Sequence, residues 1–210
     1  MIGPALRVLA ELMSLNLLWI VCSLPIVTIG PASTALCAVM LKVAQGEPVM
    51  TLKTFFEAFK RNFVQSLLLG LLGLAGLAVA AIDWFFTSVQ TGGLRILYSI
   101  VSVFVTAAVL SGWAWAFALQ ARFENSLGGT IGNALKLAFV EPGRTLLIWL
   151  AFAAVIASAV FLPFDLVLRL AAVYALVCVS APAYVAARIQ NRVFDRFSGR
   201  PEERGSEEDQ

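Results

Sequence analysis

Residues Ser14 to Lys42 read SLNLLWIVCSLPIVTIGPASTALCAVMLK, and no charged side chain occurs before the last of them. A continuous helix over 12–41 would be about 45 Å long, roughly the thickness of a bilayer with its headgroups. Pro25 and Pro31 each lack the backbone N–H that a helix uses, and Gly30 tolerates unusual dihedral angles. The segment is therefore predicted to be a long membrane span that is kinked or broken between Pro25 and Pro31.

Four further windows without charged residues follow along the chain: 62–82, 96–121, 145–164 and 170–187. Each has about the 20 residues that a helix needs to cross a bilayer, and none alternates as a barrel strand does. The 210 residues are 60% hydrophobic and 13% charged, and the mean hydropathy is +0.87. A soluble core of this size cannot bury so much apolar surface. The sequence predicts an all-α, polytopic transmembrane helical bundle of about five spans.

Lysine and arginine are distributed unevenly between the loops. The basic residues after the first, third and fifth windows are Lys42, Lys53, Lys60, Arg61, Arg122, Lys136, Arg144, Arg188, Arg192, Arg196, Arg200 and Arg204. Only Arg7, Arg95 and Arg169 fall on the other side. The positive-inside rule predicts a multi-pass membrane protein with a cytoplasmic C-terminus. We expect the N-terminus to lie outside, because a first window that crosses once places it there; if that window is re-entrant, the N-terminus lies inside.

The first basic loop predicts an amphipathic helix at the cytoplasmic interface. Residues 46–63 read GEPVMTLKTFFEAFKRNF, in which apolar residues recur at helical spacing beside lysine, glutamate and arginine. The alternative is a cytoplasmic extension of the second span. If the helix lies at the surface, it is a candidate docking site for a partner, and the residues concerned are Phe55, Phe56, Phe59, Lys60 and Arg61.

The second basic loop repeats this arrangement about 76 residues later, since Ala58-Phe59-Lys60 aligns with Ala134-Leu135-Lys136. This predicts a second interfacial helix and two tandem units, 12–86 and 94–164, followed by a last span at 170–190. Basic loops beside spans can also look alike without any repeat. All of these elements belong to one predicted transmembrane domain, 1–194. The polar residues 195–210 are predicted to be a disordered cytoplasmic tail.

The break in the first window is a candidate site for a solute. Interrupted helices in transporters expose free backbone groups near the membrane midplane, and polar side chains accompany the break here. The residues concerned are Thr28, Gly30, Pro31, Ser33 and Thr34. The alternative is a kink that serves packing, because small residues let a neighbouring helix approach closely. The sequence favours the packing alternative.

Two carboxylates lie at the predicted outer ends of ascending helices. Asp83 stands in AIDWFF and Asp165 in LPFDLVL, each beside aromatic residues. Carboxylate oxygens and aromatic faces could together bind a cation or sugar hydroxyls outside the membrane. An interfacial charge within an aromatic belt is the commoner meaning of this pattern.

Several kinds of chemistry find no support in the sequence. The chain has no histidine, which removes histidine-activated nucleophiles, HExxH zinc sites and histidine proton relays. Cys22, Cys37 and Cys178 lie within apolar windows and are expected to pack rather than to bind metal. There is no GxxxxGK[ST] motif for a nucleotide. We expect no enzyme activity, no cofactor, no metal and no nucleic-acid partner.

The sequence LNLLWIVCSLPIVTIGPASTAL, followed by KTFFEAFKRNF, resembles the YesL-like family of bacterial integral membrane proteins, whose activity is unassigned. The resemblance continues more weakly through GNALKLAF at 132–139 and APAYVAA at 181–187. Members look like companions of carbohydrate-uptake genes, so the resemblance implies a link to binding-protein-dependent sugar import. It supplies no catalytic residue.

Two functions follow as expectations. The first is a non-enzymatic accessory component that contacts the lipid bilayer and the subunits of a sugar ABC transporter. The second is a stand-alone carrier or channel for a small solute, or a divergent permease subunit, with the broken first helix as its site. The chain shows no good match to the EAA-type loop by which importer permeases contact their ATPase, so the accessory function ranks above the permease. The oligomeric state is left open.

Overall fold

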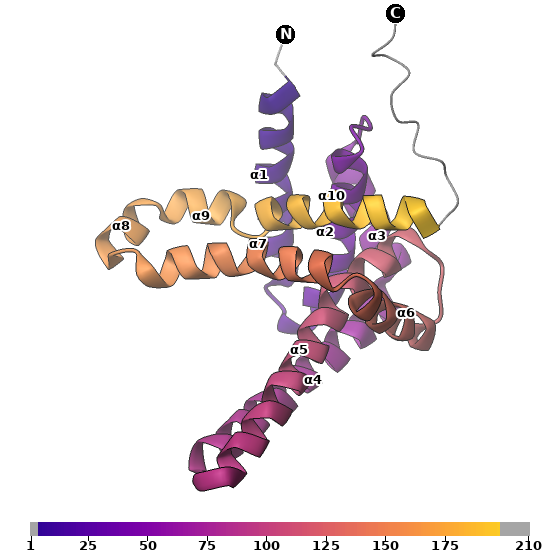
Figure 1. The fold of residues 1–210 in the computed structure, drawn as a ribbon. Coiled ribbons are helices and arrows are strands. Elements are labelled where there is room, and N and C mark those ends of the chain that lie inside the picture. The colour runs from indigo at the N-terminus through magenta and orange to yellow at the C-terminus, as the bar shows by residue number, and fades with distance from the viewer. Residues whose placement is uncertain (1–3, 198–210) are drawn as a thin grey trace, which may run out of the picture.

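The computed structural model describes residues 4–197, and every regular element within them is a helix (Figure 1). The helices are α1 (Pro4–Ser23), η1 (Ile26–Thr28), α2 (Ile29–Ala44), α3 (Thr51–Arg61), α4 (Phe63–Val89), α5 (Gly92–Arg122), α6 (Leu127–Val140), α7 (Pro142–Phe161), α8 (Phe164–Arg169), α9 (Ala171–Val177) and α10 (Ser180–Phe197). Among the described residues, five stretches are long and apolar enough to cross a membrane: Ile26–Ala44, Phe63–Val89, Gly92–Arg122, Pro142–Phe161 and Ala171–Phe197. The predicted polytopic all-α fold is confirmed.

The first apolar segment is broken where its prolines predict. Helix α1 ends before Pro25, whereas Pro31 lies in the first turn of α2, where a missing N–H leaves no helical carbonyl unpaired. The chain also reverses direction here. Trp19 Nε1 donates to Ser33 Oγ at 3.1 Å, although a continuous helix would separate these residues by about 21 Å. Helices α1 and α2 are therefore antiparallel, as Figure 1 shows.

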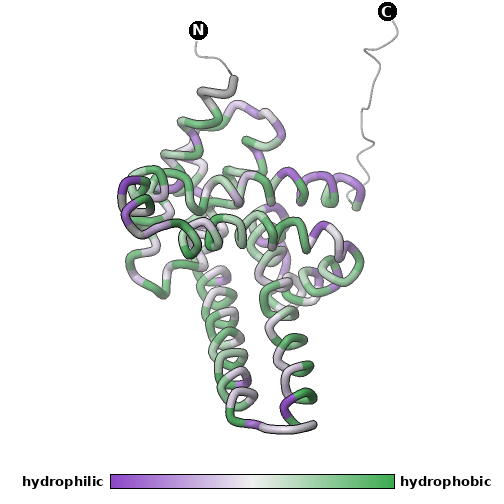
Figure 2. The backbone as a smooth tube through the Cα atoms, turned by 60° about the vertical axis from the view of Figure 1, so that its left-hand side comes forward, coloured by the Kyte–Doolittle hydropathy of each residue, from purple (hydrophilic) through white to green (hydrophobic). Residues whose placement is uncertain are grey.

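A central body carries two helical hairpins that extend in different directions. The α4–α5 hairpin projects downward, and the hairpin of α7 with α8 and α9 projects to the left (Figure 1). Figure 2 shows that the α4–α5 hairpin is hydrophobic along most of its length. The largest side chains that are fully buried in the body include Leu15, Met40, Phe55, Trp115 and Phe194, from five different helices. The core therefore sits where α1, α2, α3, α5 and α10 meet.

The two predicted short helices are present as α3 and α6. Helix α3 begins at Thr51 and α6 at Leu127, which is the predicted offset of 76 residues. Each short helix stands between two long ones, and Ala58 and Ala134 are buried at equivalent positions. The division into tandem units stays a prediction.

The last span differs from the single continuous helix that its window suggested. Helix α9 ends at Val177 and α10 begins at Ser180, because Pro182 cannot donate to the carbonyl of Cys178. Helix α10 continues to Phe197, so the start of the predicted tail, 195–197, is helical. The remainder of that tail, 198–210, lies outside the described residues.

Candidate functional site

The helix ends that carry cations meet at one end of the body. Arg122, at the end of α5, donates from Nη1 to Asn191 Oδ1 at 2.8 Å and from Nη2 to Asp195 Oδ1 at 2.6 Å. Asn191 Nδ2 in turn donates to the carbonyl of Leu41 at 2.8 Å. That carbonyl belongs to the last turn of α2, which has no helical donor for it. Helix α10 thus binds the ends of α2 and α5 together.

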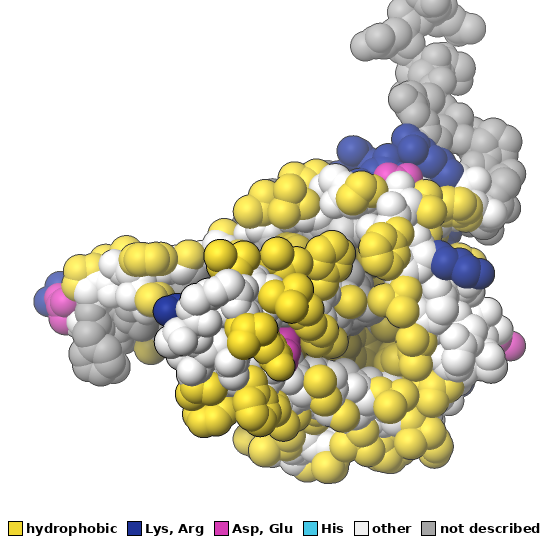
Figure 3. Space-filling view, turned by 60° about the horizontal axis from the view of Figure 1, so that its bottom comes forward, with side chains coloured by type: hydrophobic (Ala, Val, Ile, Leu, Met, Phe, Trp, Pro, Cys, Tyr) yellow, Lys and Arg dark blue, Asp and Glu magenta, His cyan; other side chains and the backbone are white. Residues whose placement is uncertain are grey.

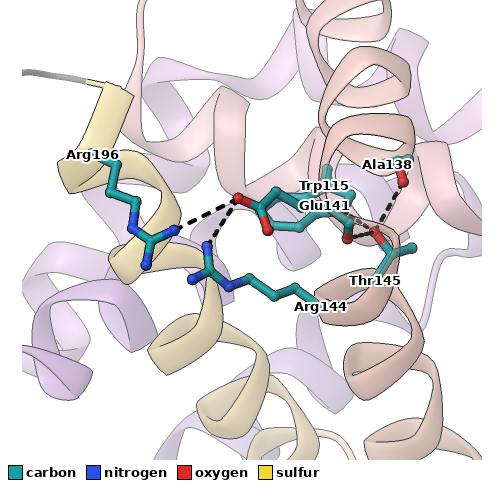
Figure 4. Close-up of polar contacts among 6 residues, drawn as sticks. All are labelled: Trp115, Ala138, Glu141, Arg144, Thr145 and Arg196. Carbon is teal, nitrogen blue, oxygen red and sulfur yellow. Dashed lines mark hydrogen bonds and ion pairs between the residues drawn. The ribbon is translucent and has the colours of Figure 1, made fainter.

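A second polar cluster joins the start of α7 to α5 and α10 (Figure 4). Arg144 Nη1 lies 3.2 Å from Glu141 Oε1, and Arg196 Nη1 approaches the same oxygen at 3.9 Å. Trp115 Nε1 donates to Thr145 Oγ1 at 3.0 Å, and this hydroxyl lies 3.0 Å from the carbonyl of Glu141, to which it donates. Because Trp115 and Thr145 are buried, each hydrogen bond satisfies a group that water cannot reach.

A third cluster links α4, α5 and α6. Gln120 Nε2 donates to Gln65 Oε1 at 2.9 Å, and Thr130 Oγ1 donates to Gln120 Oε1 at 3.0 Å. Gln65 Nε2 donates to the carbonyl of Asn125 in the loop before α6. The three clusters together fix the arrangement of helix ends at the basic end of the molecule.

The break in the last span is filled by a side chain from α1. Asn16 is fully buried, and its Nδ2 donates to the carbonyl of Ala175 at 2.7 Å. Its Oδ1 accepts from the backbone N–H groups of Val179 and Ser180, each at 3.0 Å. A regular helix would pair Val179 N–H with the Ala175 carbonyl. The amide of Asn16 therefore stands in the place of one helical hydrogen bond.

The residues of the predicted solute site lie in the α1–α2 hairpin and its contact with α4. Thr28 Oγ1 lies 2.6 Å from the carbonyls of both Cys22 and Pro25, and Ser33 accepts from Trp19. Gly30, Pro31 and Thr34 are buried. A Cβ on Gly30 would lie 2.1 Å from the carbonyl oxygen of Ser66 on α4. Gly30 therefore permits the close approach of α2 to α4, which is a packing role.

The predicted docking residues occupy two different faces of α3. Phe55 is 0% exposed and stacks on Phe59 with ring centroids 6.3 Å apart, so these rings belong to the inner face. Phe56 is 43% exposed on the outer face. Lys60 and Arg61 are exposed as well. A shallow hollow on that face is lined by Leu52, Lys53, Phe56, Glu57 and Lys60.

The two predicted outer carboxylates are not brought together. Asp83 lies on α4 in the downward hairpin, and Asp165 lies on α8 at the far end of the other hairpin (Figure 1). Asp165 is exposed, whereas Asp83 is partly buried, and its Oδ2 has no hydrogen-bond partner among the described residues. They do not form a joint cation site in the described part of the chain.

Sequence reasoning missed the uncharged polar residues that hold the body together. Asn16, Gln65 and Gln120 stand inside apolar windows that were delimited by charged residues alone. A polar side chain within a membrane span is energetically unfavourable unless a neighbouring helix supplies a hydrogen-bond partner. These three residues could therefore have been predicted to form hydrogen bonds between helices. Pro182 was likewise a signal for the break in the last span.

The fold and these contacts define the class: a polytopic helical protein whose long helices have the length and composition of membrane spans. Residues 12–84, about a third of the chain, match the model of a family described as "Protein of unknown function, DUF624". The matched part runs from α1 to near the end of α4 and includes the hairpin and α3. No curated protein and no solved structure matches the chain.

Proposed function

We propose that the protein is a non-enzymatic component of the bacterial cytoplasmic membrane that docks a partner through the outer face of α3. The partner that we propose is a subunit of an ABC-type sugar importer. The support for this partner is the resemblance of 15–63 to the YesL-like family and its link to sugar import. The support for docking is the surface of α3 itself.

The observation that carries the docking proposal is the composition of the outer face of α3. Leu52 is 61% and Phe56 43% exposed, although Phe55 and Ala58 on the same short helix are buried. Lys53, Glu57 and Lys60 border these apolar side chains, so the two cations outnumber the carboxylate. Apolar anchors with a charged rim are typical of protein interfaces. An importer subunit with an acidic rim around an apolar depression would complement this face.

The antiparallel hairpin of α1 and α2 also bears on the membrane topology of the chain. Because α1 runs opposite to α2, the start of α1 lies at the same end as Lys42, whether or not the hairpin crosses the whole bilayer. The turn between the helices is apolar, with Leu24 74% exposed, and suits a lipid environment. We therefore favour the re-entrant alternative, which places both termini in the cytoplasm and Arg7 among the cytoplasmic cations.

Affinity purification in mild detergent tests the docking proposal. The tagged wild-type protein should recover permease or ATPase subunits of a sugar importer, and the double variant Phe56→Ala/Lys60→Glu should lose most of them. Phe139→Ala is the control, because Phe139 is also an exposed phenylalanine on a short helix, α6, at 76% against 43% for Phe56. Repeated recovery without any transporter subunit would contradict the proposal. A deletion strain grown on single carbohydrates should in addition show a selective growth defect.

Cysteine accessibility tests this membrane topology. In a background with Cys22, Cys37 and Cys178 replaced by alanine, single cysteines are placed at Ala10, Gln45 and Thr91. A membrane-impermeant thiol reagent should label position 91 in intact cells, and positions 10 and 45 only after permeabilisation. Labelling of position 10 in intact cells would instead place the N-terminus outside.

The alternative carrier function has weaker support from the geometry. The hydroxyls of Thr28 and Ser33 are hydrogen-bonded within the hairpin, and Gly30 is closed off by α4. A solute would have to displace these contacts. If the break did serve transport, Thr28→Val should abolish flux while the protein still inserts normally.

A further inference from the structure

A cavity of about 250 Å³ lies between α4, α5 and α6. Its wall is apolar, and its residues include Leu69, Leu72, Gly76, Val109, Gly112 and Leu135. Gly112 leaves part of this space unfilled, since a Cβ added there would only reach ordinary contact, 3.6 Å, with Leu135. Figure 3, which looks from the side of the α4–α5 hairpin, shows a largely hydrophobic surface that is hollowed near its centre.

The cavity wall contains one polar group without a partner. Trp113 Nε1 is buried and forms no hydrogen bond with the described residues. The indole lies against Gly73, where an added Cβ would come within 2.7 Å of Nε1. An N–H group that water cannot reach is unfavourable unless an acceptor pairs with it. A ligand that is mostly apolar and carries an acceptor oxygen would satisfy both features of the wall.

The depth of the cavity matches the upper part of a lipid molecule. Leu69 is six residues from the start of α4 and Gly112 ten residues from the end of α5, which places them about 9–15 Å from the basic end. Lys136 follows Leu135 on α6, is exposed, and has no ion-pair partner among the described residues. An apolar cavity with an exposed cation next to one of its wall residues on α6 complements an acyl chain attached to an anionic headgroup.

We propose that this cavity binds one acyl chain of an anionic phospholipid. The ester carbonyl accepts the hydrogen bond of Trp113 Nε1, and the phosphate lies near Lys136. The bound lipid fills the space beside Gly112, between α5 and α6, and thereby supports the hairpin where it joins the body. Helices α4 and α5 are membrane-span candidates, so the surrounding bilayer supplies the ligand.

Photocrosslinking tests the site. The purified protein is reconstituted into phosphatidylcholine vesicles that contain a small fraction of phosphatidylglycerol with a diazirine on one acyl chain. Crosslinks should concentrate in 69–76, 108–116 and 131–135. Filling the cavity with Gly112→Leu or, at its rim, Ala108→Leu should lower that yield at least about fivefold, because the chain loses its contacts with the wall. Gly128→Leu is the control, since a Cβ added there meets no atom within 4 Å.

Headgroup exchange tests the anionic part of the proposal. The same diazirine chain on phosphatidylcholine should crosslink less. Lys136→Gln should lower the preference for phosphatidylglycerol about fivefold, which is the factor for one cation near an anionic lipid. Crosslinks spread evenly along the lipid-facing sides of α4 and α5 would overturn the site. An unchanged yield in both cavity-filling variants would also overturn it, and equal yields for the two headgroups would refute the role of Lys136.

Discussion

Replacing Asn16 by leucine should destabilise the protein, because this buried amide supports a break in a different helix. The variant removes four hydrogen bonds: Nδ2 donates to the Ala175 carbonyl and, at 3.9 Å, to Cys178 Sγ, and Oδ1 accepts from the N–H groups of Val179 and Ser180. Side-chain hydrogen bonds between membrane helices contribute about 0.6 kcal/mol each on average, with a maximum of about 1.7. Two backbone N–H groups are in addition left in an apolar environment, at a cost of about 1–3 kcal/mol each if they stay unpaired.

Part of this cost can be recovered within the last span. Without the amide, Val179 N–H can bond directly to the Ala175 carbonyl, which closes one turn between α9 and α10. The N–H of Ser180 loses its bond to Oδ1, and the Cys178 carbonyl still faces Pro182, which cannot donate. We therefore expect a net loss of about 2–4 kcal/mol in the free energy of unfolding, below the simple sum.

The assay is reversible unfolding in mixed micelles of a mild detergent and sodium dodecyl sulfate, followed by tryptophan fluorescence. The matched control is Ser14→Ala on the same helix, since the Ser14 hydroxyl is exposed and, within the described residues, bonds only to the carbonyl of Ala10. The control should change the free energy by less than about 0.5 kcal/mol. If Asn16→Leu unfolds within that same range, the amide does not stabilise the break and the reasoning fails.

Three further variants probe the other contacts by the same unfolding assay. Gly30→Ala should lower the free energy of unfolding by at least about 3 kcal/mol, because its Cβ would overlap the backbone of Ser66. Gly93→Ala is the control and should leave the free energy of unfolding unchanged, because Gly93 has open space around it. Equal stability of the two variants would refute the close α2–α4 contact. Asp195→Asn should lower the free energy of unfolding by about 1–2 kcal/mol, because it weakens the partly buried ion pair with Arg122. Lys53→Gln, in an exposed ion pair with Glu57, should lower it by less than about 0.5 kcal/mol. If Asp195→Asn loses no more than Lys53→Gln, the pair does not anchor α10 to α5. Thr145→Val should lower the free energy of unfolding by about 1–2 kcal/mol, because Trp115 Nε1 loses its acceptor. Thr91→Val is the control and should have no measurable effect, because the Thr91 hydroxyl does not cap α5. An unchanged stability of Thr145→Val would show that the hydrogen bond contributes nothing.

The proposed docking and lipid sites use neighbouring parts of the molecule but depend on different chemistry. Docking uses the outer face of α3, where Phe56 is exposed, and the lipid site uses the cavity between α4, α5 and α6. Phe56→Ala should therefore leave lipid crosslinking unchanged, and Gly112→Leu should leave recovery of a partner unchanged. Loss of both in either variant would indicate a general disturbance of the fold.

The sequence by itself determined the properties that depend on local composition. The apolar windows specify membrane-length helices, the cations mark one end of the bundle, and Pro25 specifies where the first segment breaks. The short helix α3 also follows from its amphipathic pattern, because helical periodicity can be read within a few turns. Each of these properties is set by neighbours in the chain.

Only the tertiary structure decided which separate segments meet. The break near Pro25 is compatible with a kink or a reversal, and the contact between Trp19 and Ser33 selects the reversal. Asn16 pairs with backbone groups about 160 residues away, and Gly30 permits α4 to approach α2. Such pairings depend on shape and on hydrogen-bonding partners supplied by other helices, which no window of one helix contains. The packing role of the opening stretch therefore became visible only when its neighbours were in place.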